Sequence, residues 1–162
     1  MFALDLLTRA EALLGAYRQA GLRLVTAESC TGGLVAGCLT EIAGSSDVVE
    51  RGFVTYSNTA KQEMLGIPAE LIARVGAVSA EVALAMAEGA LARSRAQVAV
   101  SITGIAGPGG ATADKPIGLV HLASCRQGAG PLQVRHVFPG DRAAVRLASV
   151  EAALDLLFHW TP

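Results

Sequence analysis

The fold is decided by residues 22–33, which read LRLVTAESCTGG. The stretch 22–27 is short and mostly hydrophobic, which predicts a buried strand. Apolar residues at helical spacing follow from Leu34 to Ile42, and the helix that they predict is expected to start at Thr31 and end at Gly44. Another helical pattern comes before the strand and stops at Gly21, a residue suited to a helix end. The segment is therefore predicted to run from helix to strand to helix, with Ser29 in the turn between the strand and the second helix.

The rest of the chain alternates helical and strand patterns in the same way. The expected strands cover residues 22–27, 51–57, 97–102, 117–125 and 132–138, and the expected helices cover 6–20, 31–44, 58–65, a stretch after Pro68, 79–90 and 141–158. Helices between strands predict an α/β fold, a three-layer αβα arrangement around a mixed, mostly parallel sheet. The last two strands are expected to form an antiparallel C-terminal hairpin. We expect residues 1–162 to form one domain.

Composition and charge exclude several kinds of partner. The net charge is −1 and Lys and Arg form no cluster, so no nucleic-acid partner is expected. No apolar run approaches the ~20 residues of a membrane span and the N-terminus lacks a basic start, so we expect a cytoplasmic protein without membrane contact. The 3 cysteines have no metal-ligand spacing, which predicts neither a disulfide nor a metal site. The mean hydropathy of +0.45 hints at a homo-oligomer face.

Lysine is rare in this chain, and one of the two lysines is a candidate catalytic base. Only Lys61 and Lys115 interrupt a set of 13 basic residues that is otherwise all Arg. Arg stays protonated in proteins, whereas a buried Lys can lose its proton. If Asn58 is the N-cap of its helix, Lys61 lies in the first turn, where the macrodipole lowers the pKa of a cation. The alternative is that Lys61 is an ordinary cation on a helix surface.

Ser29 is the candidate nucleophile that would partner Lys61. Tyr56 ends the strand before the Lys61 helix, and its hydroxyl can relay a proton or simply fill the core. Cys30 competes as the better intrinsic nucleophile, but a thiolate needs a cationic neighbour. No histidine near Cys30 in the sequence could supply that cation, so Cys30 is expected to pack in the protein interior. The three histidines, which lie outside these motifs, are His121, His136 and His159.

Two glycine-rich segments are candidates for substrate binding. The turn Thr31, Gly32 and Gly33 offers backbone N–H groups and a positive helix end, which suit a phosphate or an oxyanion, although such a turn is as often a packing device. Thr103 and Gly104 leave a buried strand and enter a Gly/Pro loop, a usual ligand position at a sheet edge.

Arg142 starts the last helix, directly after Pro139, Gly140 and Asp141. Its guanidinium can meet a substrate phosphate, pair with Asp141 or Glu28, or stay solvated. The sequence leaves these three options open.

Six separated motifs give the chain a resemblance to a known family. They are AESCTGG at 27–33, GSSDVVERGFVTYSNTAK at 44–61, GAVS at 76–79, SITGIAGPGG at 101–110, KPIG at 115–118 and PGDR at 139–142. Together they resemble the CinA C-terminal domain family over roughly Leu6 to Leu157. The family includes nicotinamide-nucleotide amidases, which hydrolyse nicotinamide mononucleotide to nicotinate mononucleotide and ammonia. The loop after Pro108 is the part that matches the family pattern least.

The resemblance implies a role for each candidate residue. Ser29 would be the nucleophile, Lys61 the base and Tyr56 the assisting hydroxyl, with Thr103 and Arg142 as substrate contacts. The N–H groups of the turn from Cys30 to Gly33 would hold the oxyanion, and the reaction would need neither a metal nor a cofactor.

Two other functions remain open from the sequence. A nucleotide- or partner-binding module linked to competence or damage responses would keep the fold without turnover. A Ser/Lys amidase could also act on a different amide, because no residue pattern names nicotinamide. A pure binding module has no reason to keep Ser29, Tyr56 and Lys61 together, and this favours the enzyme.

Overall fold

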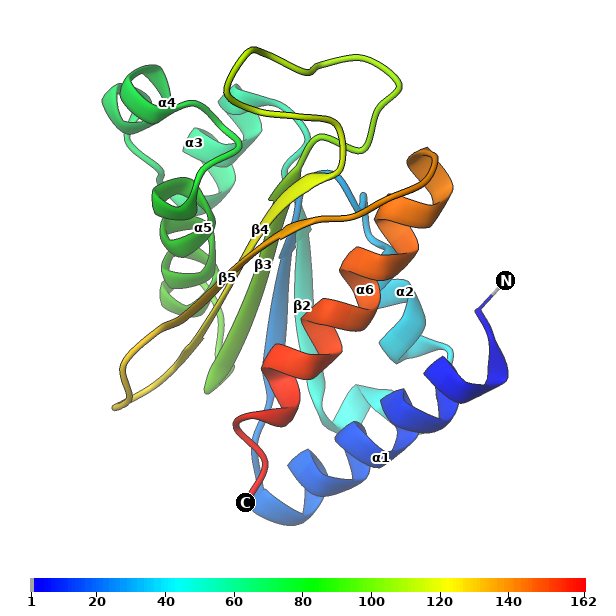
Figure 1. Cartoon of the computed structure of the whole chain (residues 1–162). Coiled ribbons are helices and arrows are strands. Elements are labelled where there is room, and N and C mark those ends of the chain that lie inside the picture. The colour runs from blue at the N-terminus through cyan, green and yellow to red at the C-terminus, as the bar shows by residue number, and fades with distance from the viewer. Residues whose placement is uncertain (1) are drawn as a thin grey trace.

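The structure is a computed structural model that describes residues 2–162, with a five-stranded sheet at its centre (Figure 1). The strand order is β2-β1-β3-β4-β5. The strands are β1 (Leu24–Glu28), β2 (Val49–Val54), β3 (Val98–Gly104), β4 (Leu119–Arg126) and β5 (Leu132–Val137). The helices are α1 (Leu4–Ala20), α2 (Leu34–Thr40), α3 (Asn58–Leu65), α4 (Ala69–Val75), α5 (Ala80–Ala92) and α6 (Arg142–Phe158), with a short 3-10 helix η1 (Ser45–Asp47).

The sheet is mixed, as the sequence predicts. Strand β1 pairs in parallel with β2 and β3, while β3 with β4 and β4 with β5 pair antiparallel, so the predicted C-terminal hairpin is confirmed. In this register Glu28 lies between Val54 and Ile102. The carboxyl ends of the three parallel strands therefore meet at one edge of the sheet. The loop between β3 and β4 arches over the same edge (Figure 1).

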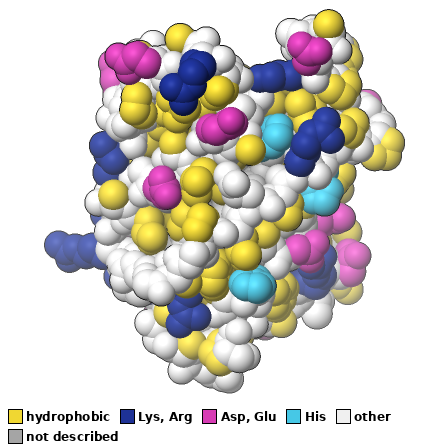
Figure 2. All heavy atoms as spheres, turned by 60° about the vertical axis from the view of Figure 1, so that its left-hand side comes forward, with side chains coloured by type: hydrophobic (Ala, Val, Ile, Leu, Met, Phe, Trp, Pro, Cys, Tyr) yellow, Lys and Arg dark blue, Asp and Glu magenta, His cyan; other side chains and the backbone are white. Residues whose placement is uncertain are grey.

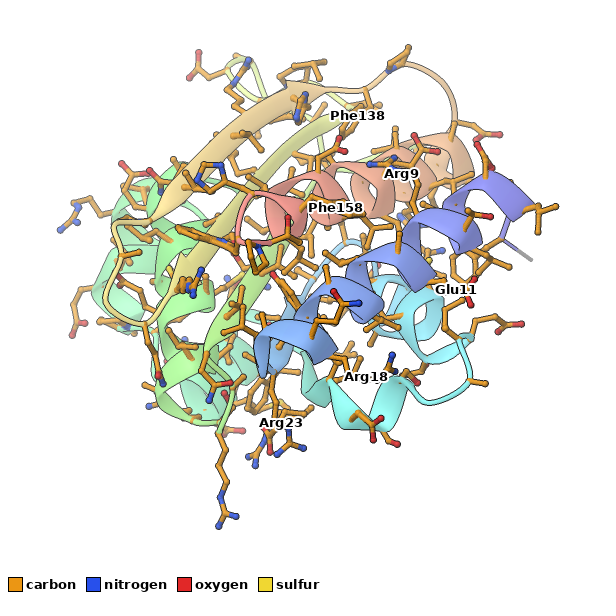
Figure 3. All side chains as sticks on the ribbon, turned by 90° about the horizontal axis from the view of Figure 1, so that it is seen from below. Arg9, Glu11, Arg18, Arg23, Phe138 and Phe158 are labelled. Atoms are coloured by element: carbon orange, nitrogen blue, oxygen red, sulfur yellow. The ribbon has the colours of Figure 1, made fainter. Side chains whose placement is uncertain are left out.

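Helices cover both faces of the sheet and give the predicted three layers. On one face α5 packs against β1, β3 and β4, and α3 and α4 pack against α5. On the other face α2 and α6 contact the sheet, and α1 packs against both of them. Figure 3 shows α1 beside α6, where the Arg9 guanidinium lies 6.0 Å from the ring centre of Phe158. Each face has its own hydrophobic cluster, because the helices on each side bury an apolar stripe against the strands.

The helix ends explain where the structure departs from the sequence prediction. Helix α2 begins three residues later than expected, because Gly32 and Gly33 take left-handed φ values of 60° and 98° that no α-helix contains. Helix α3 is capped by Ser57 instead of Asn58, since the Ser57 hydroxyl accepts the Ala60 N–H at 3.0 Å. The predicted caps Ser79 and Asp141 are confirmed at α5 and α6.

The surface carries charges of both signs. On the face seen in Figure 2, Lys and Arg side chains are scattered among Asp and Glu side chains and small hydrophobic areas. Within residues 2–162, none of the helices has the length and apolar character needed to cross a membrane.

Candidate active site

Ser29 is the first residue after β1, at the edge where the parallel strands end. Its N–H donates to the Ile102 carbonyl at 2.9 Å, which ties the turn to β3. On the other side, the Thr55 N–H donates to the Glu28 carbonyl at 2.8 Å, so the end of β2 is fixed to the same turn. The half-buried Ser29 side chain faces Lys61, whose Nζ lies 2.9 Å from Ser29 Oγ. The pair predicted from the sequence is therefore in hydrogen-bond contact.

Lys61 is buried without a carboxylate partner. Its side chain is only 1% exposed, and Nζ contacts Ser29 Oγ and donates to the Thr55 carbonyl at 2.8 Å. None of the ion pairs among the described residues includes Lys61. Burial, the largest cause, lowers the pKa of Lys61 below its ordinary value. A neutral amine held by the Thr55 carbonyl can direct its lone pair at the Ser29 hydroxyl, which is the geometry of a general base.

Because Ser57 caps α3, the lowered pKa of Lys61 has a different main cause from the one that the sequence suggested. With Ser57 as the cap, Lys61 is the fourth residue of α3 and its own N–H is already bonded to the Ser57 carbonyl. The helix dipole fades within the first turn, so its effect on Lys61 is smaller than the sequence suggested. Burial is the dominant cause.

Glu28 fills the N-terminus of α2, a role that the sequence analysis missed. This fully buried carboxylate accepts N–H groups from Gly33 at 3.0 Å, Val35 at 3.1 Å and Ala36 at 2.9 Å. The positive end of α2 is thus occupied by a side chain of the protein itself, so an external anion cannot bind there. Glu28 also does not pair with Arg142, which was one of the sequence options.

Two of the four N–H groups in the predicted oxyanion-binding turn, Cys30 to Gly33, are already bonded within the protein. The Gly32 N–H donates to the Ser29 carbonyl at 3.1 Å, and the Gly33 N–H is held by Glu28. Within residues 2–162, the N–H groups of Cys30 and Thr31 make no hydrogen bond to another residue. Cys30 lines the cavity that holds Ser29, whereas Thr31 is fully buried and lies outside its lining, so the Cys30 amide is the one that can face a negatively charged oxygen there.

Cys30 sits in the turn as a buried residue. Its side chain is 5% exposed, and burial is the main reason that the pKa of its thiol is raised to about 11. A thiol with that pKa is protonated near neutral pH and is a poor nucleophile. Its packing role, expected from the sequence, fits this environment.

Tyr56 and Arg142 meet at the mouth of the site. Tyr56 is 60% exposed, and its hydroxyl accepts a hydrogen bond from Arg142 Nη2 at 2.7 Å. Arg142 Nη1 also donates to the Gly107 carbonyl at 2.9 Å. Asp141, the other partner considered for Arg142, instead caps α6 through the Ala144 N–H at 2.9 Å. Arg142 thus joins the end of β2 to the loop after β3.

One cavity of about 230 Å³ gathers most of the predicted residues. It is lined by Ser29, Cys30, Tyr56, Lys61, Thr103, Gly104 and Arg142, together with Asn58, Ala77, Val78 and Ala106. Thr31, Gly32 and Gly33 are not among its lining residues. The Thr103 hydroxyl donates to the Ala77 carbonyl at 2.8 Å, so it holds the wall of the cavity.

A second cavity of about 380 Å³ adjoins the first and shares Ala106 and Arg142 with it. Its other walls come from the loops at 107–117 and 140–141. None of the three histidines lines either cavity. Across residues 2–162, His, Cys, Asp and Glu side chains form no group of three that could hold a metal ion.

Arg146 is a further residue of the site that sequence reasoning did not find. Its Nε donates to the Cys30 carbonyl at 3.1 Å and its Nη2 to the Thr31 carbonyl at 2.9 Å. The available signal was its spacing of four residues from Arg142, which places both side chains on one face of α6.

The chain is similar to known proteins over nearly its whole length. The profile of the CinA C-terminal domain matches residues 7–161. A protein named nicotinamide-nucleotide amidohydrolase PncC from Escherichia coli (strain K12) is 47% identical over 155 residues, which cover 96% of this chain and 94% of that protein. The crystal structure of the competence/damage inducible protein CihA from Agrobacterium tumefaciens has a TM-score of 0.96 at 51% identity, covering 98% of this chain and 97% of that chain.

Longer relatives also exist. A CinA-like protein from Syntrophobacter fumaroxidans is 51% identical over 142 residues, which cover 88% of this chain but 33% of that protein. The chain thus spans about one third of the length of several curated relatives that it matches. Because the family profile covers nearly all of its residues, the chain belongs to the CinA C-terminal domain family.

Proposed function

We propose that this chain is an amidohydrolase that converts nicotinamide mononucleotide and water into nicotinate mononucleotide and ammonia. The observation that carries the proposal is the buried contact of 2.9 Å between Lys61 Nζ and Ser29 Oγ at the wall of a cavity. The name of the Escherichia coli relative, at 47% identity over almost the whole chain, supports the substrate.

In the proposed first half of the reaction, the neutral Lys61 amine takes the Ser29 proton while Oγ attacks the carboxamide carbon. The Cys30 N–H group stabilises the oxygen that becomes negative. The C–N bond then breaks, and the Lys61 ammonium gives its proton to the departing nitrogen, directly or through Tyr56. Ammonia leaves, and the nicotinoyl group remains on Ser29 as an ester.

In the second half, a water molecule attacks the ester carbon and gives a proton to Lys61. When the C–O bond to Ser29 breaks, Lys61 returns that proton to Oγ. The product is nicotinate mononucleotide, and the amine is neutral again. Every proton in this scheme moves through Lys61, so the scheme uses no metal ion.

Arg142 is the residue in the best position to bind the substrate phosphate. The N-terminus of α2 is filled by Glu28 and that of α6 is capped by Asp141. Arg142 is exposed and borders both cavities, so its remaining N–H groups can face a phosphate in the second cavity while the carboxamide lies at Ser29.

Ammonia release from a panel of amides tests this proposal. The panel contains nicotinamide mononucleotide, nicotinamide riboside, nicotinamide and glutamine, and we expect release from the mononucleotide first. Ser29→Ala should abolish release while binding of the mononucleotide persists, because only one Oγ atom is lost. Ser46→Ala, at an exposed serine of η1, is the matched control and should keep full activity.

Each contrary result has a separate meaning. Near-normal ammonia release by Ser29→Ala would remove Ser29 as nucleophile. Ammonia release from a different amide, and not from the mononucleotide, would show that the proposed substrate is wrong. Tight binding of the mononucleotide without release from any amide would favour the nucleotide-binding module.

A further inference from the structure

The connection between α4 and α5 forms part of the wall of the candidate active site. It covers residues 76–79, and its Ala77 and Val78 line the cavity that holds Ser29 and Lys61. These two residues supply two of the three aliphatic side chains, alanine and valine, in the lining of that cavity. The connection therefore provides most of the aliphatic surface that a bound molecule can contact beside the nucleophile.

Three side chains hold three successive carbonyls where this connection begins. The donors and their acceptors are Lys115 Nζ with the Val75 carbonyl at 2.7 Å, Ser79 Oγ with the Gly76 carbonyl at 2.9 Å, and Thr103 Oγ1 with the Ala77 carbonyl at 2.8 Å. Among the described residues, no backbone N–H donates to any of these carbonyls. The path of the connection thus depends on side chains, and Lys115 reaches it from the loop between β3 and β4.

Lys115 is well suited to this contact. None of the ion pairs within residues 2–162 includes Lys115. Val75 is the last residue of α4, where the helix dipole favours a cation and the final carbonyls lack partners within the helix. A Cβ at position 76 would lie 2.7 Å from Lys115 Nζ, so glycine there leaves the space that the ammonium occupies. The GAVS and KPIG motifs of the sequence therefore meet at one contact.

We propose that Lys115 is a positioning residue that fixes residues 75–78 as the wall that contacts the substrate ring, an inference that rests on the proposed function. The pyridine ring beside the carboxamide is a flat aromatic surface, and Ala77 and Val78 offer it aliphatic contacts. Lys115 is not among the residues that line this cavity, so it acts through the carbonyl that it holds. Ring contacts are equally strong before and during the reaction, so the wall improves binding without speeding the chemical step.

The first test is Lys115→Met, which keeps the length of the side chain but removes the donor. We expect KM for nicotinamide mononucleotide to rise about 10-fold, the scale of one lost contact in an apolar pocket, while kcat stays within about twofold of the wild type. Lys115→Arg retains a donor for the Val75 carbonyl and should keep KM within about threefold of the wild type.

Arg135→Met is the matched control for the loss of charge. Arg135 is exposed and lines, together with Lys115, a neighbouring cavity of about 410 Å³. Its guanidinium makes none of the three contacts that hold the connection. Arg135→Met should therefore leave kcat and KM unchanged. An equal rise of KM in Arg135→Met and Lys115→Met would overturn the inference, because the lost charge would then explain both.

A second measurement does not depend on the nucleotide. When a fluorophosphonate labels an activated serine, Oγ forms a bond to phosphorus, the hydroxyl proton passes to Lys61 and fluoride leaves. We expect the wild type to react faster at Ser29 with a benzyl fluorophosphonate than with a methyl one, because the benzyl ring gains the wall. Lys115→Met should lower the ratio of benzyl to methyl labelling rates about 10-fold and leave the methyl rate within about twofold.

The outcomes separate this inference from the proposed function. A wild-type KM and an unchanged labelling ratio in folded Lys115→Met would overturn the role of Lys115. Equal losses in kcat and in the methyl labelling rate would do so too, because the whole site would then depend on Lys115. If the wild type labels at Ser29 but releases no ammonia from the mononucleotide, the substrate assignment fails, and the labelling ratio still decides the role of Lys115. A wild type that does neither would overturn both proposals.

Discussion

At the scale of single residues, the decisive feature is an amine that is buried without a counter-charge. Lys61 contacts only a hydroxyl and a carbonyl through Nζ, so burial favours its neutral form. A residue that merely bound a phosphate would gain from staying charged. A catalytic Lys61 must therefore be neutral, whereas a phosphate-binding Lys61 would be charged. A substitution that keeps the positive charge distinguishes these two roles.

Lys61→Arg should be nearly as inactive as Lys61→Ala, with kcat lowered by at least about 100-fold. A guanidinium cannot shed its proton near neutral pH, although it binds phosphate at least as well as an ammonium. Ammonia release from the mononucleotide measures both variants. An active Lys61→Arg enzyme would exclude Lys61 as the base.

The same prediction has a pH signature. The base must be neutral in the free enzyme, so kcat/KM of the wild type should rise with pH through the pKa of Lys61 and level off below about 10.4, the ordinary lysine value. A rate that does not change with pH across this range would contradict the assignment.

Cys30→Ala should keep most of the activity, within about threefold of the wild type. Its thiol is protonated because burial raises the pKa to about 11, and it is Ser29 that contacts Lys61. Ammonia release and the rate of inactivation by a thiol reagent check this. Complete loss of turnover with normal thermal stability would favour a cysteine nucleophile.

The sequence could name Ser29, Lys61, Tyr56 and Arg142 because a family motif and the rarity of lysine mark them. It could not reveal Glu28 or Arg146 as parts of the site. Both act on backbone groups, Glu28 on N–H groups of α2 and Arg146 on carbonyls of the turn. Backbone partners carry no sequence motif, and the spacing of Arg146 from Arg142 places it on the same face of α6 without showing that it reaches the turn after β1.

At the scale of elements, Glu28 links a strand to the helix that follows it. It is the last residue of β1, and its carboxylate accepts three N–H groups at the start of α2. The site turn between them is therefore anchored at both ends.

Glu28→Gln should lower the free energy of unfolding by about 2–3 kcal/mol, since a neutral amide oxygen accepts more weakly and its NH₂ group faces N–H donors. Thermal or urea unfolding measures the effect. Glu11→Gln, at an exposed position of α1 (Figure 3), is the control and should change stability by less than about 0.5 kcal/mol. Equal stabilities of the two variants would show that the Glu28 carboxylate does not hold α2.

The elements themselves were well marked in the sequence. Every expected strand and helix is present, and the caps at Ser79 and Asp141 were predicted correctly. The start of α2 was predicted wrongly because the helix was extended back from the apolar residues to Thr31, across Gly32 and Gly33, which take left-handed φ values. The N-cap of α3 was misplaced because Ser57 and Asn58 are both good caps, and only the structure shows which side chain bonds.

At the scale of the whole molecule, the buried amine connects activity to stability. The folded-state pKa of Lys61 is lowered, so in the range between that pKa and the ordinary value of about 10.4 the unfolded chain binds more protons than the native one. Lys61 therefore contributes stability that increases with pH in this range, and the cost of burying Lys61 is fully present below it.

Compared with Lys61→Met, the wild type should gain up to about 1.4 kcal/mol of unfolding free energy per pH unit within that range. Urea unfolding of both proteins at a series of pH values measures the difference. Arg9→Met is the control, because arginine does not titrate there, and its curve should run parallel to the wild type. A constant difference between wild type and Lys61→Met would mean that Lys61 has an ordinary pKa.

The route of the chain through the molecule has a consequence for its synthesis. Ser29 and Lys61 lie in the first part of the chain, whereas Arg142 and Arg146 come from the last helix, which contacts the turn after β1 and the loop after β3. A growing polypeptide on the ribosome thus has its serine and lysine long before the two guanidinium groups emerge. Under the proposed function, hydrolytic competence arrives only when translation has delivered α6, so an unfinished chain does not consume its substrate.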